Sequence, residues 1–115
     1  YIDFKTTRPA GKEVLEVKNT INAYNAAIKN IADSKGLAIA DVYDFMNKVK
    51  VGYNYNGIAI SNKYITGNAF SLDGIHLTPM GYAIMANIFI DAINAKYNTA
   101  LEKVDATQYP AVLIP

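Results

Sequence analysis

The most constraining stretch of this chain is residues 70–82, because it combines the only histidine with a clear helix start. His76 follows Asp73 by three positions, and Thr78 and Pro79 come directly after it. Threonine is a common N-cap, and proline suits the first helical position, where a missing N–H costs nothing. The pattern therefore predicts a short loop that carries His76, followed at once by a helix.

An aspartate three positions before a histidine suits acid–base chemistry. The carboxylate can hold one imidazole nitrogen and fix the tautomer, while the other nitrogen faces a reacting hydroxyl. The spacing alone is weak evidence, because the chain has 10 acidic residues. The alternative is a solvated surface loop in which Asp73 and Gly74 make a turn. If the acid–base interpretation holds, Asp73 and His76 are the candidate catalytic residues.

Composition bounds the class of protein. The 115 residues fit one domain or part of one, and 51% hydrophobic with 18% charged residues is a globular balance. A net charge of +1 with scattered lysines gives no basic patch, so we expect no nucleic-acid partner. Without cysteine and with one histidine, the chain gives no support for a metal or cofactor site. No apolar run reaches membrane-span length, and residues 1–5 lack signal-peptide features.

Hydrophobic periodicity predicts a long amphipathic helix in the first third of the chain. Its apolar residues recur at spacings of three and four, namely Val14, Val17, Ile21, Tyr24, Ile28 and Ile31. Gly36 fits the end of this helix. The pattern is too short for a coiled coil, so we expect this face to pack on a sheet or on other helices. Residues 1–8 before it indicate a short strand or an incoming linker.

The segment that follows this helix has apolar residues on both parities. Residues 37–43 therefore indicate a buried strand of a parallel sheet. Asp41 and Asp44 lie near its carboxyl end, where open α/β sheets place their sites. For Asp44, however, we favour the simpler role of N-cap to a short helix at residues 45–49.

The second half of the chain gives three further expectations. Residues 58–60 and 64–66 indicate a small hairpin. The helix after Pro79 is expected to bury one apolar face, with Asn87 on the opposite side. This face comprises Tyr82, Met85, Ala86, Phe89, Ile90, Ile93 and Tyr97. Residues 109–115 are expected to form an apolar extended tail laid across the fold.

The string D-G-I-H-L-T-P-x-G-Y at residues 73–82 resembles the last conserved block of SGNH hydrolases, also called GDSL lipases or acylhydrolases. In that family Asp and His complete a Ser-His-Asp triad, so the resemblance implies that Asp73 is the orienting acid and His76 the general base. The long helix, residues 36–42, residues 64–71 and residues 108–115 also look like the end of such a hydrolase.

The resemblance implies an α/β fold, the helix-rich C-terminal portion of a flavodoxin-like three-layer sandwich with one buried parallel-type strand and a small hairpin. Residues 1–115 would be a single C-terminal segment, in keeping with a start that is not methionine. The family's Gly-Asp-Ser nucleophile motif is missing from the chain, and Ser34, Ser61 and Ser71 lack a nucleophile context. Gly52-Tyr53-Asn54 matches the family's Gly-x-Asn motif only by coincidence, because it follows the final strand.

The expected function is ester hydrolysis, with this chain supplying the Asp-x-x-His part and inactive alone. The implied substrate is a small ester or acylated molecule, and the implied location is extracytoplasmic, periplasmic or secreted. The implied partner is the N-terminal half of the same protein. Without that half, the edge of an unpaired strand would promote self-association. The alternative is a non-catalytic helical interaction module with a vestigial Asp-x-x-His loop.

Overall fold

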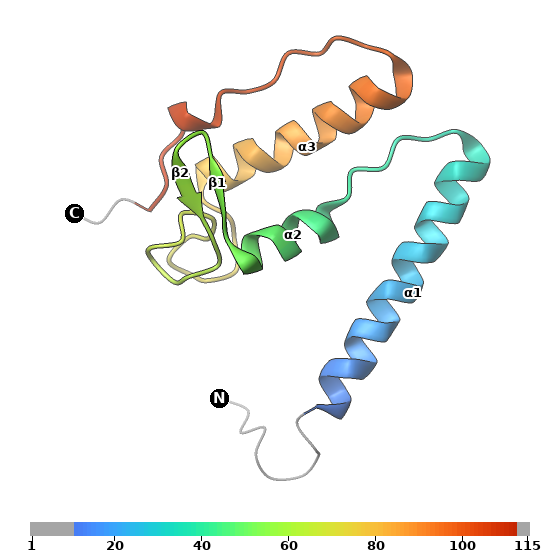
Figure 1. Ribbon diagram of the computed structural model, residues 1–115, viewed down its shortest axis with the longest axis horizontal. Helices are drawn as coiled ribbons and strands as arrows, with labels where there is room; N and C mark the ends of the chain where they lie inside the picture. The colour runs from blue at the N-terminus through green and yellow to red at the C-terminus, as the bar shows by residue number, and fades with distance from the viewer. Residues whose placement is uncertain (1–10, 113–115) are drawn as a thin grey trace. The chain divides into compact units, whose positions relative to one another are not determined.

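The computed structural model describes residues 11–112 and consists of two compact units, residues 1–37 and 38–115 (Figure 1). The first unit contains α1 (Lys12–Lys35). The second contains α2 (Val42–Val51), β1 (Tyr53–Tyr55), β2 (Ile58–Ile60), α3 (Pro79–Tyr97) and the 3-10 helix η1 (Ala106–Gln108). The described part is a helix-rich α/β structure with one small antiparallel sheet. The segment expected at residues 1–8 and the end of the expected tail lie outside the described residues.

Helix α1 forms where the periodicity predicts it. It ends at Gly36, whose φ of 66° lies in the left-handed region, and the N–H of Leu37 bonds to the carbonyl of Ala32 at 2.9 Å. Its predicted apolar face is exposed: Val14 and Tyr24 keep 68% and 66% of their surface accessible. Within the first unit, no described residue covers the apolar row of this amphipathic helix.

The expected parallel strand at residues 37–43 is not found. Residues 37–41 have no regular structure, and α2 already begins at Val42. The N–H of Ala38 donates to the hydroxyl of Tyr97 at 3.1 Å rather than to a neighbouring strand. A strand needs such a neighbour for its backbone groups, and the described residues supply none at this position.

The expected N-cap at Asp44 is wrong by one turn. The carboxylate of Asp41 caps α2 by accepting the N–H of Asp44 at 2.8 Å. Asp44 instead lies in the first turn, where its negative charge favours the helix dipole, and it pairs with Lys48 at 2.7 Å. Both aspartates are thereby explained by helix formation.

The hairpin forms, but with a different partner from the expected one. β2 pairs with the preceding strand β1, in the register Tyr53 opposite Ile60 and Tyr55 opposite Ile58. The two strands are joined by Asn56 and Gly57, with φ values of 49° and 89°. Two residues with positive φ make the type I′ turn that suits a tight hairpin, so an Asn-Gly turn fixes the pairing.

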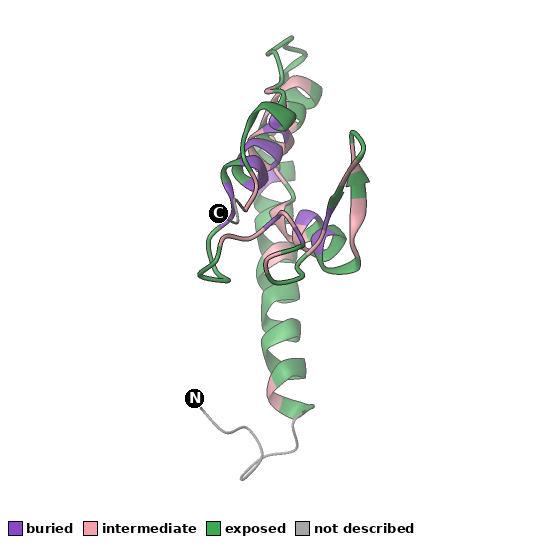
Figure 2. Ribbon diagram, turned by 90° about the vertical axis from the view of Figure 1, so that its left-hand side faces the viewer, coloured by how far each residue is buried: buried purple, intermediate pink, exposed green. Residues whose placement is uncertain are grey.

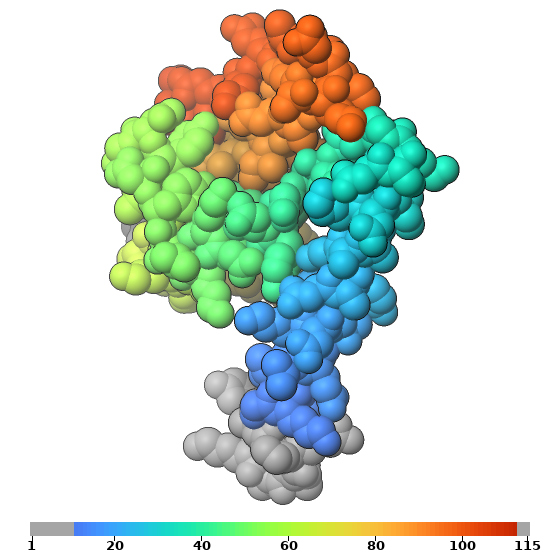
Figure 3. All heavy atoms as spheres, turned by 45° about the vertical axis from the view of Figure 1, so that its right-hand side comes forward, coloured from blue at the N-terminus to red at the C-terminus, as the bar shows by residue number. Residues whose placement is uncertain are grey.

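The core of the second unit is formed by α2, β2, α3 and η1 together with the loop before α3. Buried residues are purple in Figure 2. The core comprises Phe45, Val49, Ile60, Ala69, Leu77, Met80, Ala83, Ile84 and Ala106. Figure 3 shows the hairpin and the chain after α3 in one continuous mass with α2 and α3. This packing places the start of α3 against the loop that carries the predicted site.

The buried face of α3 differs from the expected one. Tyr82, Phe89 and Tyr97 are about half exposed, at 49%, 47% and 49%. Asn87, expected on the polar face, is buried because its side chain exchanges two hydrogen bonds with the backbone of Val104, at 2.7 and 2.8 Å. α3 is apolar nearly all round, so periodicity cannot select the side that packs.

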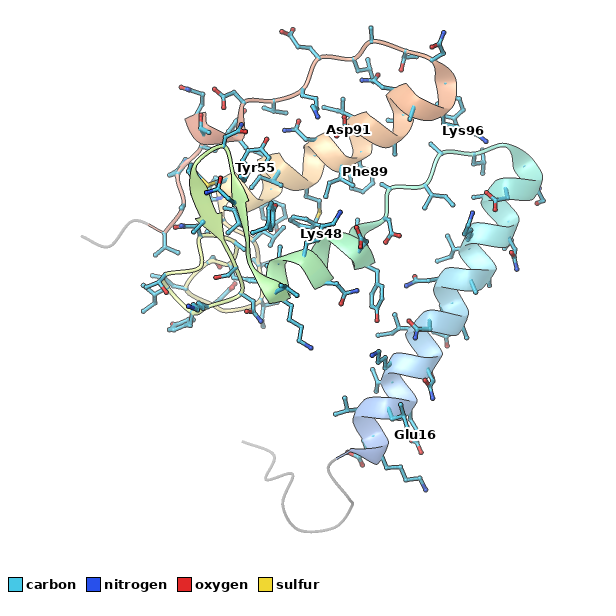
Figure 4. The ribbon with its side chains drawn as sticks, viewed as in Figure 1. Glu16, Lys48, Tyr55, Phe89, Asp91 and Lys96 are labelled. Atoms are coloured by element: carbon cyan, nitrogen blue, oxygen red, sulfur yellow. The ribbon has the colours of Figure 1, made fainter. Side chains whose placement is uncertain are left out.

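Two surface ion pairs flank this core (Figure 4). Lys48 on α2 pairs with Asp44 on the same helix, and Asp91 on α3 pairs with Lys103 at 3.0 Å. The second pair, like the Asn87 contacts, connects α3 to the chain that follows it. The described residues include no helix that is both long and apolar enough to cross a membrane.

Gly81 is required where α3 meets the preceding loop. A Cβ added there would lie 2.5 Å from the carbonyl oxygen of Ala69 and 3.1 Å from the Cβ of Leu77. Alanine is the better helix former, so without this contact Gly81→Ala would stabilise the chain by about 1 kcal/mol. We expect the reverse, a loss of about 1–3 kcal/mol as in other overpacked cores, measured by thermal denaturation. A raised or unchanged melting temperature would contradict the close packing.

Candidate acid–base site

The predicted loop is closed by its own backbone before α3 begins. Phe70 and Leu77 form an antiparallel bridge, and the N–H of Ser71 donates to the carbonyl of His76 at 2.8 Å. Inside this closure, the N–H of Gly74 bonds to the carbonyl of Ser71 at 3.0 Å, with Gly74 at a φ of 69°. The loop is therefore a tight turn with Asp73 and His76 near its two ends.

Thr78 joins this turn to the helix, as the sequence predicts. Its hydroxyl accepts the N–H of Gly81 at 3.0 Å and donates to the carbonyl of Asn68 at 2.7 Å. Thr78 is 2% exposed, and Pro79 is the first residue of α3. A buried cap with both hydrogen-bonding functions satisfied fixes the position of the turn on the core.

Asp73 and His76 are in direct contact. The Nδ1 atom of His76 lies 2.6 Å from Oδ2 of Asp73. With a proton on Nδ1, the imidazole donates to the carboxylate and its Nε2 atom keeps a free lone pair. The side chains of His76 and Asp73 are 69% and 46% exposed, so this pair is accessible from outside the turn. The arrangement can accept a proton from a hydroxyl that approaches Nε2.

The Asp73 carboxylate is held in its ionised form. Donation from the hydroxyl of Ser71 lowers the pKa of Asp73 most, and His76 and the backbone N–H groups of Ile75 and His76 lower it further. The result is a pKa well below the ordinary value for aspartate. Asp73 therefore stays a hydrogen-bond acceptor at any pH where an ordinary aspartate is already ionised.

A residue from the loop that precedes the turn, Tyr64, is hydrogen-bonded to the turn. The hydroxyl of Tyr64 donates to the carbonyl of Leu72 at 2.8 Å. The next residue, Ile65, has a φ of 66°, which is strained for a β-branched side chain. Beside the turn lies a cavity of about 410 Å³ whose lining includes Met46, Phe70 and Gly74. Gly74 of the turn lines this partly apolar cavity, but Asp73 and His76 are not among the described residues that line it.

The three serines of the chain form side-chain hydrogen bonds, and none of these bonds is to the imidazole of His76. Ser34 bonds to the carbonyl of Ile31 at 2.8 Å, and Ser61 accepts the N–H of Lys63 at 3.4 Å. Ser71 donates to the acid rather than to the base, at 2.6 Å from Oδ1 of Asp73. Among the described residues there is also no group of three or more His, Asp or Glu side chains suited to hold a metal ion.

Sequence reasoning missed two of the groups that hold this pair. On sequence alone, Ser71 is considered only as a nucleophile, and Tyr64 only within a hairpin strand and the family resemblance. The only signal for Ser71 is its position two residues before Asp73, which places a hydroxyl near the carboxylate once the chain turns. No sequence signal singles out Tyr64, because its contact with Leu72 spans eight residues of irregular chain.

Comparison with protein families places this geometry in a known context. The model of the GDSL-like lipase/acylhydrolase family matches residues 5–89, which include Asp73 and His76. The chain therefore belongs to the GDSL-like lipase/acylhydrolase family. Membership supports esterase or acylhydrolase activity as a general class. Neither a search of curated proteins nor a search of solved structures found a match.

Proposed function

We propose that Asp73 and His76 are the acid–base half of a Ser-His-Asp esterase. The observation that carries this proposal is the 2.6 Å contact between Nδ1 of His76 and Oδ2 of Asp73, within the region that matches the family model. The His76 side chain is 69% exposed, so a substrate can reach its imidazole. Its Nε2, the ring nitrogen that does not contact Asp73, is the atom that a general base needs.

The chemistry follows from the two nitrogens of one imidazole. A serine hydroxyl attacks the ester carbonyl, and Nε2 of His76 takes its proton as the new C–O bond forms. His76 then returns that proton to the departing alkoxide, which leaves as the alcohol. Asp73 keeps the Nδ1–H tautomer and compensates the charge of the imidazolium. A water molecule repeats the sequence on the acyl-enzyme and releases the acid.

We propose that the serine and the oxyanion donors come from a preceding part of the same protein. In this reading, residues 1–115 are the C-terminal segment of a flavodoxin-like three-layer SGNH domain. Two observations support it: the chain has no Gly-Asp-Ser motif, and its own serines bond elsewhere. The exposed apolar row of α1 is a surface that such a segment would cover. In its absence, this row favours self-association.

The substrate we propose is a small ester or another small acylated molecule. The cavity beside the turn, of about 410 Å³, has the size of a small-molecule pocket and a partly apolar lining. Its lining includes Gly74, which lies between Asp73 and His76 in the chain. An acyl or alkyl group seated there would lie against Gly74, the residue that follows Asp73.

The 115-residue chain alone is expected to show no serine-esterase activity. Purified chain is incubated with an activated acetate ester and, separately, with a serine-reactive phosphonate followed by peptide mass mapping. We expect no hydrolysis above the buffer rate and no label, because no described serine donates to the base. The matched control is the protein extended by its upstream coding sequence, which is expected to label at an upstream serine. Stoichiometric label on Ser34, Ser61 or Ser71 of the short chain would contradict the proposal.

A non-catalytic interaction module is the second candidate, and one observation favours it. The apolar row of α1 is exposed along the helix, as a partner-binding helix would be. The two candidates predict different behaviour of the extended protein. An esterase would hydrolyse esters and react with the phosphonate, whereas an interaction module would do neither.

A further inference from the structure

We propose that Ser71 is a positioning residue of the acid–base pair, whose hydroxyl holds the Asp73 carboxylate so that Oδ2 stays aimed at His76. The importance of Ser71 for catalysis rests on the proposed function, whereas its hydrogen bond to Asp73 is observed in the structure. Ser71 would be neither the nucleophile nor a group that touches substrate.

The two oxygens of the Asp73 carboxylate have separate partners. Oδ1 accepts three hydrogen bonds, from the hydroxyl of Ser71 at 2.6 Å and from the N–H groups of Ile75 and His76 at 2.9 Å each. Oδ2 is left for the imidazole Nδ1 of His76, also at 2.6 Å. Anchoring one oxygen in this way determines where the other one points.

Hydrogen bonds, rather than packing, must do this anchoring. The Asp73 side chain is 46% exposed, so its neighbours do not enclose it. The terminal torsion of an aspartate is intrinsically broad, and a loosely held carboxylate samples many orientations. The backbone donors of Ile75 and His76 both come from the chain that follows Asp73. Ser71 donates from the chain that precedes it, so the carboxylate is held from both sides.

Ser71 is itself held by the turn. Its N–H bonds to the carbonyl of His76 at 2.8 Å, and its carbonyl accepts the N–H of Gly74 at 3.0 Å. The hydroxyl therefore projects from a backbone that is fixed at both its donor and its acceptor. Its proton is committed to the acid, at the short distance typical of a bond to a charged acceptor. The same bond is the main cause of the lowered pKa of Asp73.

The test is nuclear magnetic resonance of the 115-residue chain, in which His76 is the only histidine and its imidazole signals are unambiguous. In the parent chain, the 15N shifts of the His76 imidazole should report mainly the Nδ1–H tautomer. In Ser71→Ala they should move toward the mixed-tautomer values of free histidine, and the Asp73 carboxyl should titrate at a higher pH. Unchanged imidazole shifts and an unchanged carboxyl titration in a folded Ser71→Ala chain would overturn the proposal.

A matched pair of variants separates the hydroxyl from the shape of the side chain. Ser71→Thr keeps a hydroxyl and Ser71→Val replaces it by a methyl group of similar size, so both carry the same steric change. We expect Thr to retain the parent shifts and Val to behave as Ala does, and this pair decides the question even if Ser71→Ala does not fold. Equal shifts in Thr and Val would contradict the proposal. Ser34→Ala, on α1, controls for the loss of a serine elsewhere.

Kinetics of the extended protein distinguish this inference from the proposed function. Ser71→Ala should lower kcat about tenfold with little change in KM, as loss of a group that orients a catalytic residue does, and Ser71→Thr should restore most of it. If His76→Ala is fully active while Ser71→Ala still shifts the tautomer, the proposed function fails and the positioning contact stands. If His76→Ala is inactive and Ser71→Ala has parent kcat and parent shifts, the positioning role fails alone.

Discussion

Replacing His76 by Ala is expected to lower kcat for ester hydrolysis by the extended protein on the order of a thousandfold or more. The methyl side chain cannot take the proton of the attacking serine or return it to the leaving alcohol. KM for a short-chain ester should change little, because His76 acts on the reacting atoms in the transition state. The measurement is steady-state hydrolysis of an activated acetate ester.

The His76→Ala substitution should leave the fold intact, and this can be checked directly. The His76 side chain is 69% exposed, and the N–H that residue 76 donates to Asp73 is kept in the variant. Thermal denaturation should therefore give a melting temperature close to that of the parent. Lys96→Ala, a surface change in the last turn of α3, is the matched control and should retain full activity. Parent-like hydrolysis by His76→Ala would remove His76 from the mechanism.

Asp73→Asn is expected to lower kcat by roughly a thousandfold to ten-thousandfold, because it changes the tautomer rather than the shape. The amide oxygen can still accept from Ser71 and from the two backbone N–H groups, so the turn should persist. The amide NH₂ then faces Nδ1 of His76 and favours the imidazole with its proton on Nε2. That tautomer has no lone pair to offer the serine. The measurement is kcat at a pH above the imidazole titration, with the tautomer read from 15N shifts.

The chain offers a close control for this substitution. Asp105 also accepts hydrogen bonds from the hydroxyl and the N–H of Thr107, two residues on, and its pKa is likewise lowered by them. It has no histidine partner, so Asp105→Asn should leave kcat unchanged. An Asp73→Asn enzyme within tenfold of the parent would show that another group orients His76.

The Asp73–His76 contact and the Thr78 cap could be predicted from the sequence because their determinants are local, while the catalytic role of the pair stays a prediction. Asp73 and His76 are three residues apart, and Thr78 and Pro79 mark a helix start by chemistry that acts within one turn. The structure has this cap and this pair in contact. The hydroxyl direction of Ser71 was not predictable in the same way, because it depends on the closed backbone of the turn as well as on spacing.

The fold was less predictable where the outcome depends on distant partners. Residues 37–43 are apolar on both parities, which a buried strand and the start of a packed helix share. The helix is favoured over a strand here by the Asp41 cap and by the hydrogen bond between Ala38 and Tyr97, which lie 59 residues apart. The correct partner of β2 could have been predicted locally, because Asn56-Gly57 is a strong type I′ turn signal. For α3, buried Asn87 could not be foreseen without Val104.

The most direct test of the acid–base assignment is the rate of phosphonate labelling in the extended protein, with the labelled residue identified by peptide mapping. The proposed function predicts rapid stoichiometric labelling of one serine upstream of Tyr1, slowed on the order of a thousandfold in His76→Ala because the serine loses its base. Labelling at the same rate in His76→Ala would show that His76 is not the base for this serine, and label on Ser71 would contradict the upstream position of the nucleophile.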